Sequence, residues 1–498
     1  MTEPERGIVL GGSWAGMLTA RMLSRHMRHV TVVERDVFPA EPRVRKGTPQ
    51  ARHSHILWSG GARIVEEFLP GTLDRLADAG ARRIVFQRDA VTLGPHGWQH
   101  RFPSRQFGIM CGRALLDWVV REETLSTGSI DVRQHTEAVQ LLGEPERITG
   151  VRVRDTTSGA ETTLRADLVV DATGRGSRLA NWLADLGLPP LEEDVVDAGM
   201  AYCSRLYQAP PGATDGFPPV NIAADPHSGE PGRFGAVYPQ EGRRWIVTLA
   251  GTRGAKLPSR EADFVPYART LRDPLVADLI EGAEPLSDVM VSRFGANRRL
   301  YPERLDAWPE GLLVLGDALA VFNPIYGHGM SAAARGVAAL DEQLAKPGPH
   351  PAREAQRAIS ERVDDPWIMA ASKDIEYVDC HVRVTDPRLT GGAADRHQFS
   401  AFIDTRALRS PAVSAVMTDV ASLSVSPAEL STSRFLALMS RDELRPELAA
   451  PPLSAEELAL VNLGARAPAA TATAPHGLAA TAGSVSSARP VSEEGHPS

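Results

Sequence analysis

The chain has 498 residues, of which 43% are hydrophobic and 23% charged, so it is long enough for two or three globular domains. Its formal net charge of -8 argues against a nucleic-acid-binding protein, because such proteins concentrate basic side chains on one surface. No apolar run reaches the roughly 18 residues that a membrane helix needs, and the chain opens without a basic and apolar leader. We therefore expect no membrane span and a cytoplasmic location.

The first predicted unit is a strand, a glycine turn, a helix and a second strand. The short apolar runs "RGIVL" and "VTVVER" enclose a stretch in which apolar residues recur at helical spacing. The turn between them, "GGSWAG", carries Gly11, Ser13, Ala15 and Gly16 and resembles the dinucleotide fingerprint G-x-G-x-x-G, with serine in place of the middle glycine. Such a turn lies at a helix N-terminus, where backbone N–H groups bind a pyrophosphate. These features together predict dinucleotide binding.

An acidic residue near the end of the second strand narrows the choice of dinucleotide. Glu34 follows the turn, and its carboxylate can accept hydrogen bonds from both hydroxyls of a ribose, whereas it would repel a 2′-phosphate. The pattern therefore favours an ADP moiety without that phosphate, as in FAD or NAD. We expect the neighbouring Arg35, and Gln50 further along the chain, to contact the cofactor as well.

A polar segment, "RKGTPQARHSHILWSGG" at residues 45–61, precedes the next predicted helix. His53 and His55 form an H-x-H pair, which is one pattern of metal ligands, but no acidic or cysteine partner lies nearby in the sequence. Solvated or cofactor-facing loop residues are the alternative interpretation, which we favour. The cysteines are widely separated, so they indicate neither a zinc site nor a disulfide framework: Cys111, Cys203 and Cys380. We predict no metal site.

Residues from about 190 to 290 show a different sequence pattern. Alternating stretches such as "RFGAVYP" and "RRWIVTLAG", separated by Pro- and Gly-containing loops, are typical of a mostly antiparallel sheet with one solvated face. Its apolar side chains, such as Phe234, Val237 and Trp245, either belong to the core of this sheet or line a substrate tunnel beside the cofactor domain. Beyond residue 350 the pattern is mainly helical, and residues 465–498 hold too few large apolar groups to fold, so we predict a disordered tail.

A second glycine turn lies about 300 residues after the first. The segment "LLVLGDALAVFNPIYGHGM" places Asp317 directly after a strand and a glycine, and a helix is expected from about Met330. This segment resembles the G-D-A-x-x-x-x-x-P-x-x-G-x-G motif of the FAD-dependent monooxygenases of the aromatic-hydroxylase and squalene-epoxidase type. The resemblance implies that Asp317 binds the ribityl chain of FAD and that the helix N-terminus faces the flavin ring. The other motif positions in this segment are Pro324, Gly327 and Gly329.

The same resemblance assigns residues in three further segments. In "CGRALLDWVVREE" it places Arg113 near the pyrophosphate and the ribityl chain, and in "EAVQLL" it makes the backbone of Val139 the neighbour of the adenine. The segment "DLVVDATGRGS" departs from the family pattern, because Thr173 stands where an aspartate usually serves both FAD and NADPH contacts. The resemblance therefore leaves two electron routes open: direct use of NAD(P)H, or supply through a separate flavin reductase.

These patterns predict an α/β fold with a Rossmann-like FAD-binding domain, an inserted and mostly antiparallel β-sheet substrate domain, and a C-terminal helical region. The FAD-binding domain is expected to be discontinuous, with the substrate domain inserted between its parts. The expected boundaries are 1–75, 105–185 and 290–350 for the FAD-binding domain, 76–104 and 186–289 for the substrate domain, and 351–464 for the helical region.

Residues from about 5 to 460 are also similar to the flavin epoxidases of polyether ionophore biosynthesis, of the monensin and lasalocid type. The similarity rests on "RKGTPQARHSHILWSGG", "GWQHRFPS", "CGRALLDW", "RFGAVYP" and "NPIYGHGMS". It implies that a flavin 4a-hydroperoxide, formed from reduced FAD and O2, epoxidises in succession the E alkenes of a linear polyene polyketide. An epoxide hydrolase would act downstream. Because the cofactor carries the chemistry, we assign no catalytic side chain.

Other functions share parts of this pattern. An FAD-dependent hydroxylase of an aromatic or polyketide substrate would carry the same cofactor motifs. A flavin-dependent halogenase would add a W-x-W-x-I-P segment and a catalytic lysine; the segment does not occur, and the chain has only four lysines. A prenyl reductase would consume no oxygen, and a flavoprotein sensor would bind FAD without turnover.

Overall fold

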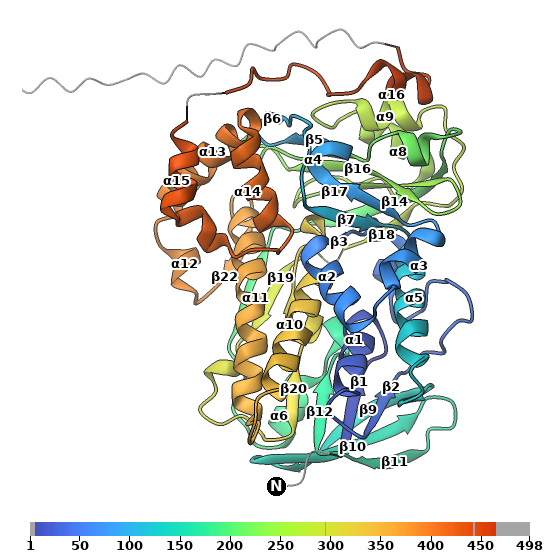
Figure 1. Ribbon diagram of the computed structural model, residues 1–498, viewed down its shortest axis with the longest axis vertical. Coiled ribbons are helices and arrows are strands. Elements are labelled where there is room, and N and C mark those ends of the chain that lie inside the picture. Colours follow the sequence, from blue (N-terminus) through green and yellow to red (C-terminus); the bar gives the residue numbers. More distant parts are fainter. Residues whose placement is uncertain (1–4, 294, 442–443, 465–498) are drawn as a thin grey trace, which may run out of the picture.

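The computed structural model describes residues 5–293, 295–441 and 444–464. The tail that the composition predicts to be disordered, residues 465–498, lies outside the described residues. The predicted mixed α/β fold is confirmed. A parallel sheet occupies one half of the molecule, a mostly antiparallel sheet the other, and helices from the C-terminal part of the chain flank both (Figure 1). Among the described residues, no helix is both long and apolar enough to cross a membrane.

The parallel sheet has five strands in the order β20-β12-β1-β2-β8, and every neighbouring pair is parallel. The strands are β1 (Arg6–Leu10), β2 (His29–Val33), β8 (Ile130–Arg133), β12 (Leu168–Asp171) and β20 (Leu312–Val314). All residues of β12 and β20 are buried, as expected for strands covered on both faces. The order of the strands explains why the site needs segments from the whole chain: neighbours in the sheet lie up to about 160 residues apart in sequence.

The helices beside the parallel sheet pack against one another. Helix α1 contacts α5 and α10, and α10 also contacts α2 and α11. Helix α1 packs directly against the glycine turn that precedes it. A Cβ at Gly16 would lie only 1.8 Å from the carbonyl oxygen of Gly11. Only glycine therefore allows α1 to begin where it does. The bounds are α1 (Trp14–Leu23), α2 (Ser59–Phe68), α3 (Thr72–Asp78), α5 (Arg113–Leu125), α6 (Leu179–Asp185), α10 (Gly329–Leu344) and α11 (Ala352–Asp374).

The second large sheet has seven strands in the order β18-β14-β17-β16-β15-β5-β6. All its pairs are antiparallel except β15 with β5. Trp245 and Val237 are buried in its own hydrophobic core, together with Phe264. The strands are β5 (Val91–Gly94), β6 (Gly97–Trp98), β14 (Ala201–Gln208), β15 (Val220–Ile222), β16 (Arg233–Gln240), β17 (Arg244–Gly251) and β18 (Met290–Ser292), and the short helices that join them are α7 (Ala213–Gly216), α8 (Phe264–Ala268) and α9 (Leu275–Ile280).

Three smaller sheets join these parts. One is an antiparallel meander of β9 (Thr136–Glu144), β10 (Arg147–Asp155) and β11 (Glu161–Arg165). A second has the order β21-β19-β13-β22, with bounds β13 (Glu193–Asp197), β19 (Asn297–Leu300), β21 (Ala320–Val321) and β22 (His381–Arg383). The third has the order β3-β7-β4, with bounds β3 (Leu57–Trp58), β4 (Arg82–Val85) and β7 (Phe107–Met110), and α4 (Phe86–Asp89) follows β4.

Strands from one expected segment belong to different sheets, so the sheets do not follow the expected boundaries at every point. Within residues 76–104, β4 pairs with β7 while β5 and β6 complete the seven-stranded sheet. Strand β18, which starts at Met290, also belongs to that sheet, since it pairs with β14. The division into a discontinuous cofactor domain and an inserted substrate domain stays a proposal.

Of the helices after α11, α13, α14 and α15 lie beside the seven-stranded sheet and above α10 in the view of Figure 1, α12 lies next to α11, and α16 lies near α9. They are α12 (Pro387–Thr390), α13 (Ala393–Arg409), α14 (Pro411–Ala421), α15 (Ser433–Met439) and α16 (Ala455–Leu460). The predicted helical character of this part of the chain is thereby confirmed, with the three-residue strand β22 as an addition.

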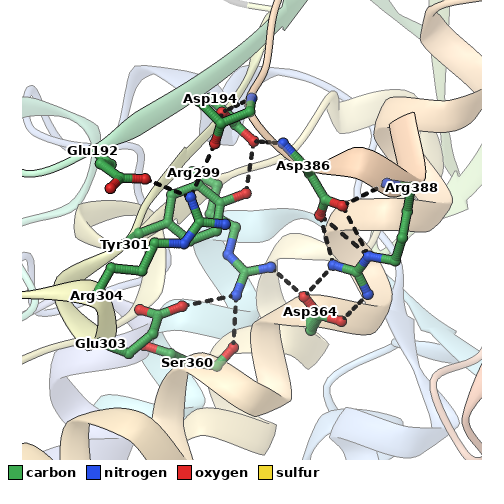
Figure 2. Close-up of polar contacts among 11 residues, drawn as sticks. Glu192, Asp194, Arg299, Tyr301, Glu303, Arg304, Ser360, Asp364, Asp386 and Arg388 are labelled. Atoms are coloured by element: carbon green, nitrogen blue, oxygen red, sulfur yellow. Dashed lines mark hydrogen bonds and ion pairs between the residues drawn. The ribbon is translucent and has the colours of Figure 1, made fainter. Parts of the chain in front are cut away.

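A network of charged side chains fastens α11 and α12 to strands β13 and β19 (Figure 2). Arg299 on β19 and Arg388 on α12 both donate hydrogen bonds to Asp364 on α11. Arg388 also binds Asp386, and the buried carboxylate of Asp194 accepts a hydrogen bond of 2.8 Å from Tyr301. Burial alone would raise the pKa of Asp364, but the hydrogen bonds from Arg388 and Arg299 outweigh it and lower the pKa to about 2.

We predict that Asp364→Asn destabilises the fold in a pH-dependent way. The folded pKa of Asp364 lies below the unfolded value, so its stabilisation is present above the unfolded pKa and is lost as the pH falls through the folded pKa. Urea unfolding at neutral pH should show a loss of about 1–2 kcal/mol, less than full linkage gives because Arg388 is half exposed. The difference should vanish between about pH 5 and pH 2. Glu361→Gln, on the exposed surface of the same helix, is the control and should change neither value.

Candidate functional site

One cavity of about 1510 Å³ runs between the two halves of the molecule. Ligand pockets usually measure about 300–1,000 Å³, so this one has room for a second ligand beside a dinucleotide. Its wall includes the turns after β1, β12 and β20, the H-x-H segment, the seven-stranded sheet, the end of α11, and α13 with α14. Twelve of the fourteen residues that the sequence singles out for the cofactor line it: Gly11, Ser13, Ala15, Glu34, Arg35, Gln50, Arg113, Asp317, Pro324, Gly327, Gly329 and Met330.

The turn after β1 has the geometry of a pyrophosphate-binding turn. Gly11 has a φ of 96°, a conformation that favours glycine, and its N–H donates to the carbonyl of Val33. Ser13 is the N-cap residue of α1 in extended conformation, but its hydroxyl makes no capping hydrogen bond. Ser13 lies at the cavity wall, and its extended backbone conformation does not require glycine at this position.

Glu34 is buried and held by the same turn. Its Oε2 atom accepts a hydrogen bond of 2.7 Å from the N–H of Gly12 and lies 3.3 Å from the guanidinium of Arg45. Arg45 also stacks on the ring of Phe38. The sequence analysis missed Arg45, because a basic residue in a polar loop gives no signal that it pairs with an acid eleven positions earlier in the chain. The ion pair and the hydrogen bond from Gly12 hold the Glu34 carboxylate in place at the cavity wall.

Arg113 is the first residue of α5, and its side chain is buried. Its Nε atom donates 2.8 Å to Asp117, one turn further along the helix, which fixes the guanidinium at the cavity. His55 of the H-x-H pair also lines the cavity. Its Nδ1 donates a hydrogen bond of 2.9 Å to the carbonyl of His53. Burial, followed by the charge of Arg113, lowers the pKa of His55 to about 3. The imidazole is therefore neutral at physiological pH.

The turn after β20 brings an unpartnered carboxylate to the cavity. Asp317 lines the cavity, and within the described part of the chain its carboxylate accepts no hydrogen bond from the protein. Burial raises the pKa of Asp317, while the charges of Arg175 and Arg113 oppose this shift. Gly327 has a φ of 66° and packs against Ile56 so closely that a Cβ there would lie 2.5 Å away. Helix α10 then begins at Gly329 beside Asp317.

Two of the fourteen predicted residues lie off the cavity wall. Gly16 serves the close packing of α1 on the turn. Val139 lies in β9, and its carbonyl accepts a hydrogen bond from the indole of Trp182 at 3.3 Å, while the neighbouring Ala138 lines the cavity. The role of Val139 beside an adenine stays a prediction. Thr173 lines the cavity too, but its hydroxyl donates to Asp171 at 2.6 Å.

A buried carboxylate on α11 fixes the turn before α10, and no sequence motif marks it. Asp374 accepts hydrogen bonds from Asn297 at 2.7 Å, Asn323 at 2.8 Å and Tyr326 at 2.6 Å. Tyr202 of the seven-stranded sheet donates to Asn323 as well. Burial raises the pKa of Asp374 to about 6, although these three hydrogen bonds favour the carboxylate. Asp374 therefore links α11 to the segment 323–326 and to strand β19, and Asn323 extends the link to Tyr202 on β14.

The apolar residues of the seven-stranded sheet, for which core or cavity positions were both expected, occupy different places. Phe234 lines the cavity, whereas Val237 and Trp245 lie in the core of the seven-stranded sheet. His53 and His55 both line the cavity. Within the described ranges, no group of three or more His, Cys, Asp or Glu side chains has the arrangement of a metal site.

Residues 6–356 match the family model of the FAD binding domain. The chain belongs to this FAD-binding family. It is 31% identical over 387 residues to Protein Rv3254 of Mycobacterium tuberculosis, which covers 75% of this chain and 81% of that protein. It is 28% identical over 401 residues to a kynurenine 3-monooxygenase of Salinispora arenicola, covering 76% of this chain and 81% of the relative. The protein is an FAD-dependent monooxygenase, with FAD as its cofactor and with NAD(P)H and O2 as the co-substrates typical of these enzymes.

Solved structures share the fold of this FAD-dependent monooxygenase. The flavin-dependent brominase Bmp2 superposes with a TM-score of 0.60 at 14% identity, covering 87% of this chain and 96% of that one. PqsL of Pseudomonas aeruginosa, described as a probable FAD-dependent monooxygenase, superposes with a TM-score of 0.56 at 18% identity, covering 78% and 99%. At these identities the likeness concerns the architecture alone, which includes both large sheets and the C-terminal helices.

The cavity residues fit FAD. The N-termini of α1 and α10 both reach the cavity, where helix dipoles and the N–H groups of a first helical turn favour the negative charge of a pyrophosphate or a reduced flavin. The free carboxylate of Asp317 suits a chain of hydroxyls, and the buried Glu34 suits a ribose. The two helix N-termini, the Asp317 carboxylate and the Glu34 carboxylate therefore fit the two halves of this cofactor.

We predict that Asp317→Ala weakens FAD binding by about tenfold or more, because a carboxylate that accepts hydrogen bonds from cofactor hydroxyls is removed. Titration of the apoprotein with FAD, followed by the quenching of flavin fluorescence, measures the dissociation constant. Asp306→Ala, at an exposed position after β19, is the matched control and should bind like the parent protein. An unchanged dissociation constant for Asp317→Ala would contradict the assignment of this residue to the cofactor.

Proposed function

We propose that this monooxygenase epoxidises the E alkenes of a linear polyene polyketide, one after another, as in polyether ionophore biosynthesis. The observation that carries the proposal is the single cavity of about 1510 Å³, which continues beyond the cofactor turns along the seven-stranded sheet to α13 and α14. A long substrate with several alkenes needs such a space, because each alkene in turn must reach the same reactive position. The similarity of the quoted segments to the polyether epoxidases supports the same substrate class.

Two groups of residues hold FAD in this proposal. The turn after β1 with Glu34 and Arg35 binds the ADP half, through Gly11, Ser13, Ala15 and Gly16, and Val139 lies beside the adenine. The second group, near the flavin half, comprises Gln50, Arg113, Asp317, Pro324, Gly327, Gly329 and Met330. When bound and reduced, FAD activates O2 so that one oxygen atom can be transferred to an electron-rich double bond.

The protein's own contribution is to orient the alkene and to exclude water. Apolar side chains from three directions line the part of the cavity beyond the cofactor turns: Ile222, Phe234, Ala401, Leu408, Met417 and Met369. Their surfaces favour an elongated apolar ligand and disfavour water, which would divert the activated oxygen. Epoxidation needs no side-chain nucleophile, and we assign none.

Hydroxylation of an aromatic substrate is the second candidate function. The specific observation in its favour is the 28% identity to the kynurenine 3-monooxygenase of Salinispora arenicola over most of both chains. It predicts a ring hydroxyl in the product instead of an epoxide. For either reaction, the threonine at position 173, where an aspartate is usual, supports electron supply through a separate flavin reductase.

The proposal predicts that the FAD-loaded enzyme adds one oxygen atom from O2 to each E alkene of a linear triene polyketide. The reaction is started with NADPH, with and without a flavin reductase, under heavy-isotope oxygen gas, and products are analysed by mass spectrometry. We expect mono-, di- and tri-epoxides that carry the heavy isotope. Anaerobic incubation is the control and should leave the triene unchanged.

Two outcomes would contradict epoxidation, and a third would change only the route of electron supply. Products without the heavy isotope would exclude a monooxygenase reaction on this substrate. A labelled aromatic product from an aromatic substrate, with an untouched triene, would support hydroxylation instead. Epoxides formed with NADPH alone would retain the epoxidase and remove the separate reductase from the proposal.

A further inference from the structure

The H-x-H segment forms a chain of hydrogen bonds with the seven-stranded sheet. Nδ1 of His53 lies 2.8 Å from the hydroxyl of Ser204 on β14, and that hydroxyl lies 2.6 Å from the hydroxyl of Thr248 on β17. The hydroxyl of Thr248 in turn lies 2.6 Å from that of Ser54, whose backbone N–H also donates to Thr248 at 3.2 Å. One imidazole and three hydroxyls are thus linked across two elements distant in sequence.

Three members of this hydrogen-bond chain line the cavity, namely His53, Ser54 and Thr248. The fourth, Ser204, is fully buried behind them. Within the described part of the structure, Nε2 of His53 has no hydrogen-bond partner in the protein, so the chain ends there at the cavity. The position is close to the turn before α10, because the ring of His53 lies 6.3 Å from that of Tyr202, which hydrogen-bonds Asn323 and Ile325.

The chain can present either a donor or an acceptor at Nε2. Each hydroxyl in it donates once, and the direction of all donations can reverse together, so His53 adopts whichever tautomer the ligand requires. Burial, followed by the charge of Arg52, lowers the pKa of His53 to about 4, so the ring is neutral at physiological pH. A neutral imidazole in a largely apolar wall suits an uncharged oxygen better than a carboxylate.

We propose that His53, held by Ser204 and Thr248, binds an uncharged oxygen of the substrate, a hydroxyl or a carbonyl, and so sets the position of the alkene relative to the cofactor turns. This inference deepens the proposed function and rests on it in one respect: the cavity beyond the cofactor is taken to hold the substrate. It assigns a substrate class, namely polyenes that carry an alcohol or a ketone, in preference to hydrocarbons of the same shape.

The test measures equilibrium binding to the FAD-loaded, oxidised enzyme, without turnover. The two probes are all-trans farnesol, a linear triene alcohol, and the hydrocarbon of the same skeleton that lacks the hydroxyl. We expect the parent enzyme to prefer the alcohol by about tenfold, since a buried partner left unpaired by the hydrocarbon costs roughly that factor. Equilibrium dialysis gives both dissociation constants.

Two variants and one control identify the residue responsible. His53→Phe keeps a ring and removes both nitrogens, so the affinity for the alcohol should fall to that for the hydrocarbon. Thr248→Val keeps the shape of the side chain and breaks the chain in its middle, so we expect about a threefold loss in preference. His96→Phe alters a histidine that also lines the cavity but makes no contact with this chain, and it should leave the preference unchanged.

The affinity of each variant for FAD distinguishes a substrate contact from a cofactor contact. We expect the FAD dissociation constant of His53→Phe to equal that of the parent. Equal binding of both probes by the parent enzyme, binding of neither, or a loss of FAD affinity in His53→Phe with an unchanged preference would each overturn the proposal. Because no oxygen is transferred in this experiment, its failure is separate from that of the epoxidation assay.

Discussion

The site depends on one topological constraint: β1, β12 and β20 are parallel neighbours, so the turns that follow them emerge at the same edge of the sheet. Contacts between the turns are close. A Cβ at Gly11 would lie 2.6 Å from the carbonyl oxygen of Ala172, and a Cβ at Gly316 would lie 3.0 Å from the Cβ of Ala15. Segments separated by 300 residues therefore form one surface, and the cofactor contacts follow from strand order more than from any single motif.

Charge is distributed unevenly around this edge. Glu34 is paired with Arg45, and Arg113 with Asp117, so both are held in position before any ligand arrives. Asp317, in contrast, keeps its carboxylate available at the cavity wall. Burial keeps the nearby imidazoles of His53 and His55 neutral. The cavity thus combines fixed ions near the cofactor turns with neutral hydrogen-bonding groups toward the sheet, which is the arrangement that an apolar substrate beside a charged cofactor requires.

Local patterns and long-range contacts differ in how well they can be predicted. The glycine turn at Gly11 and the segment around Asp317 were predictable, because their chemistry lies within a few consecutive residues, and the structure brings both to one cavity. Arg45, Asp374 and the partners of His53 were not, since each acts through a residue on another element. The same reason explains why Phe234 lines the cavity but Val237, three positions later on the same strand, lies in the core: pattern alone does not say which face of a sheet a ligand meets.

Asp374 lies beyond residue 356, where the match to the FAD-binding family ends, yet it holds the turn from which α10 begins. The support of this turn therefore includes a residue from the part of α11 that extends past the matched range. Helix α14 also reaches this turn, because the carbonyl of its last residue, Ala421, accepts a hydrogen bond from Nε2 of His328, whereas α13 lines the far wall of the cavity. Substitutions on α13 are therefore expected to reshape the far wall of the cavity and leave the turn before α10 in place, whereas substitutions near the end of α11 affect both.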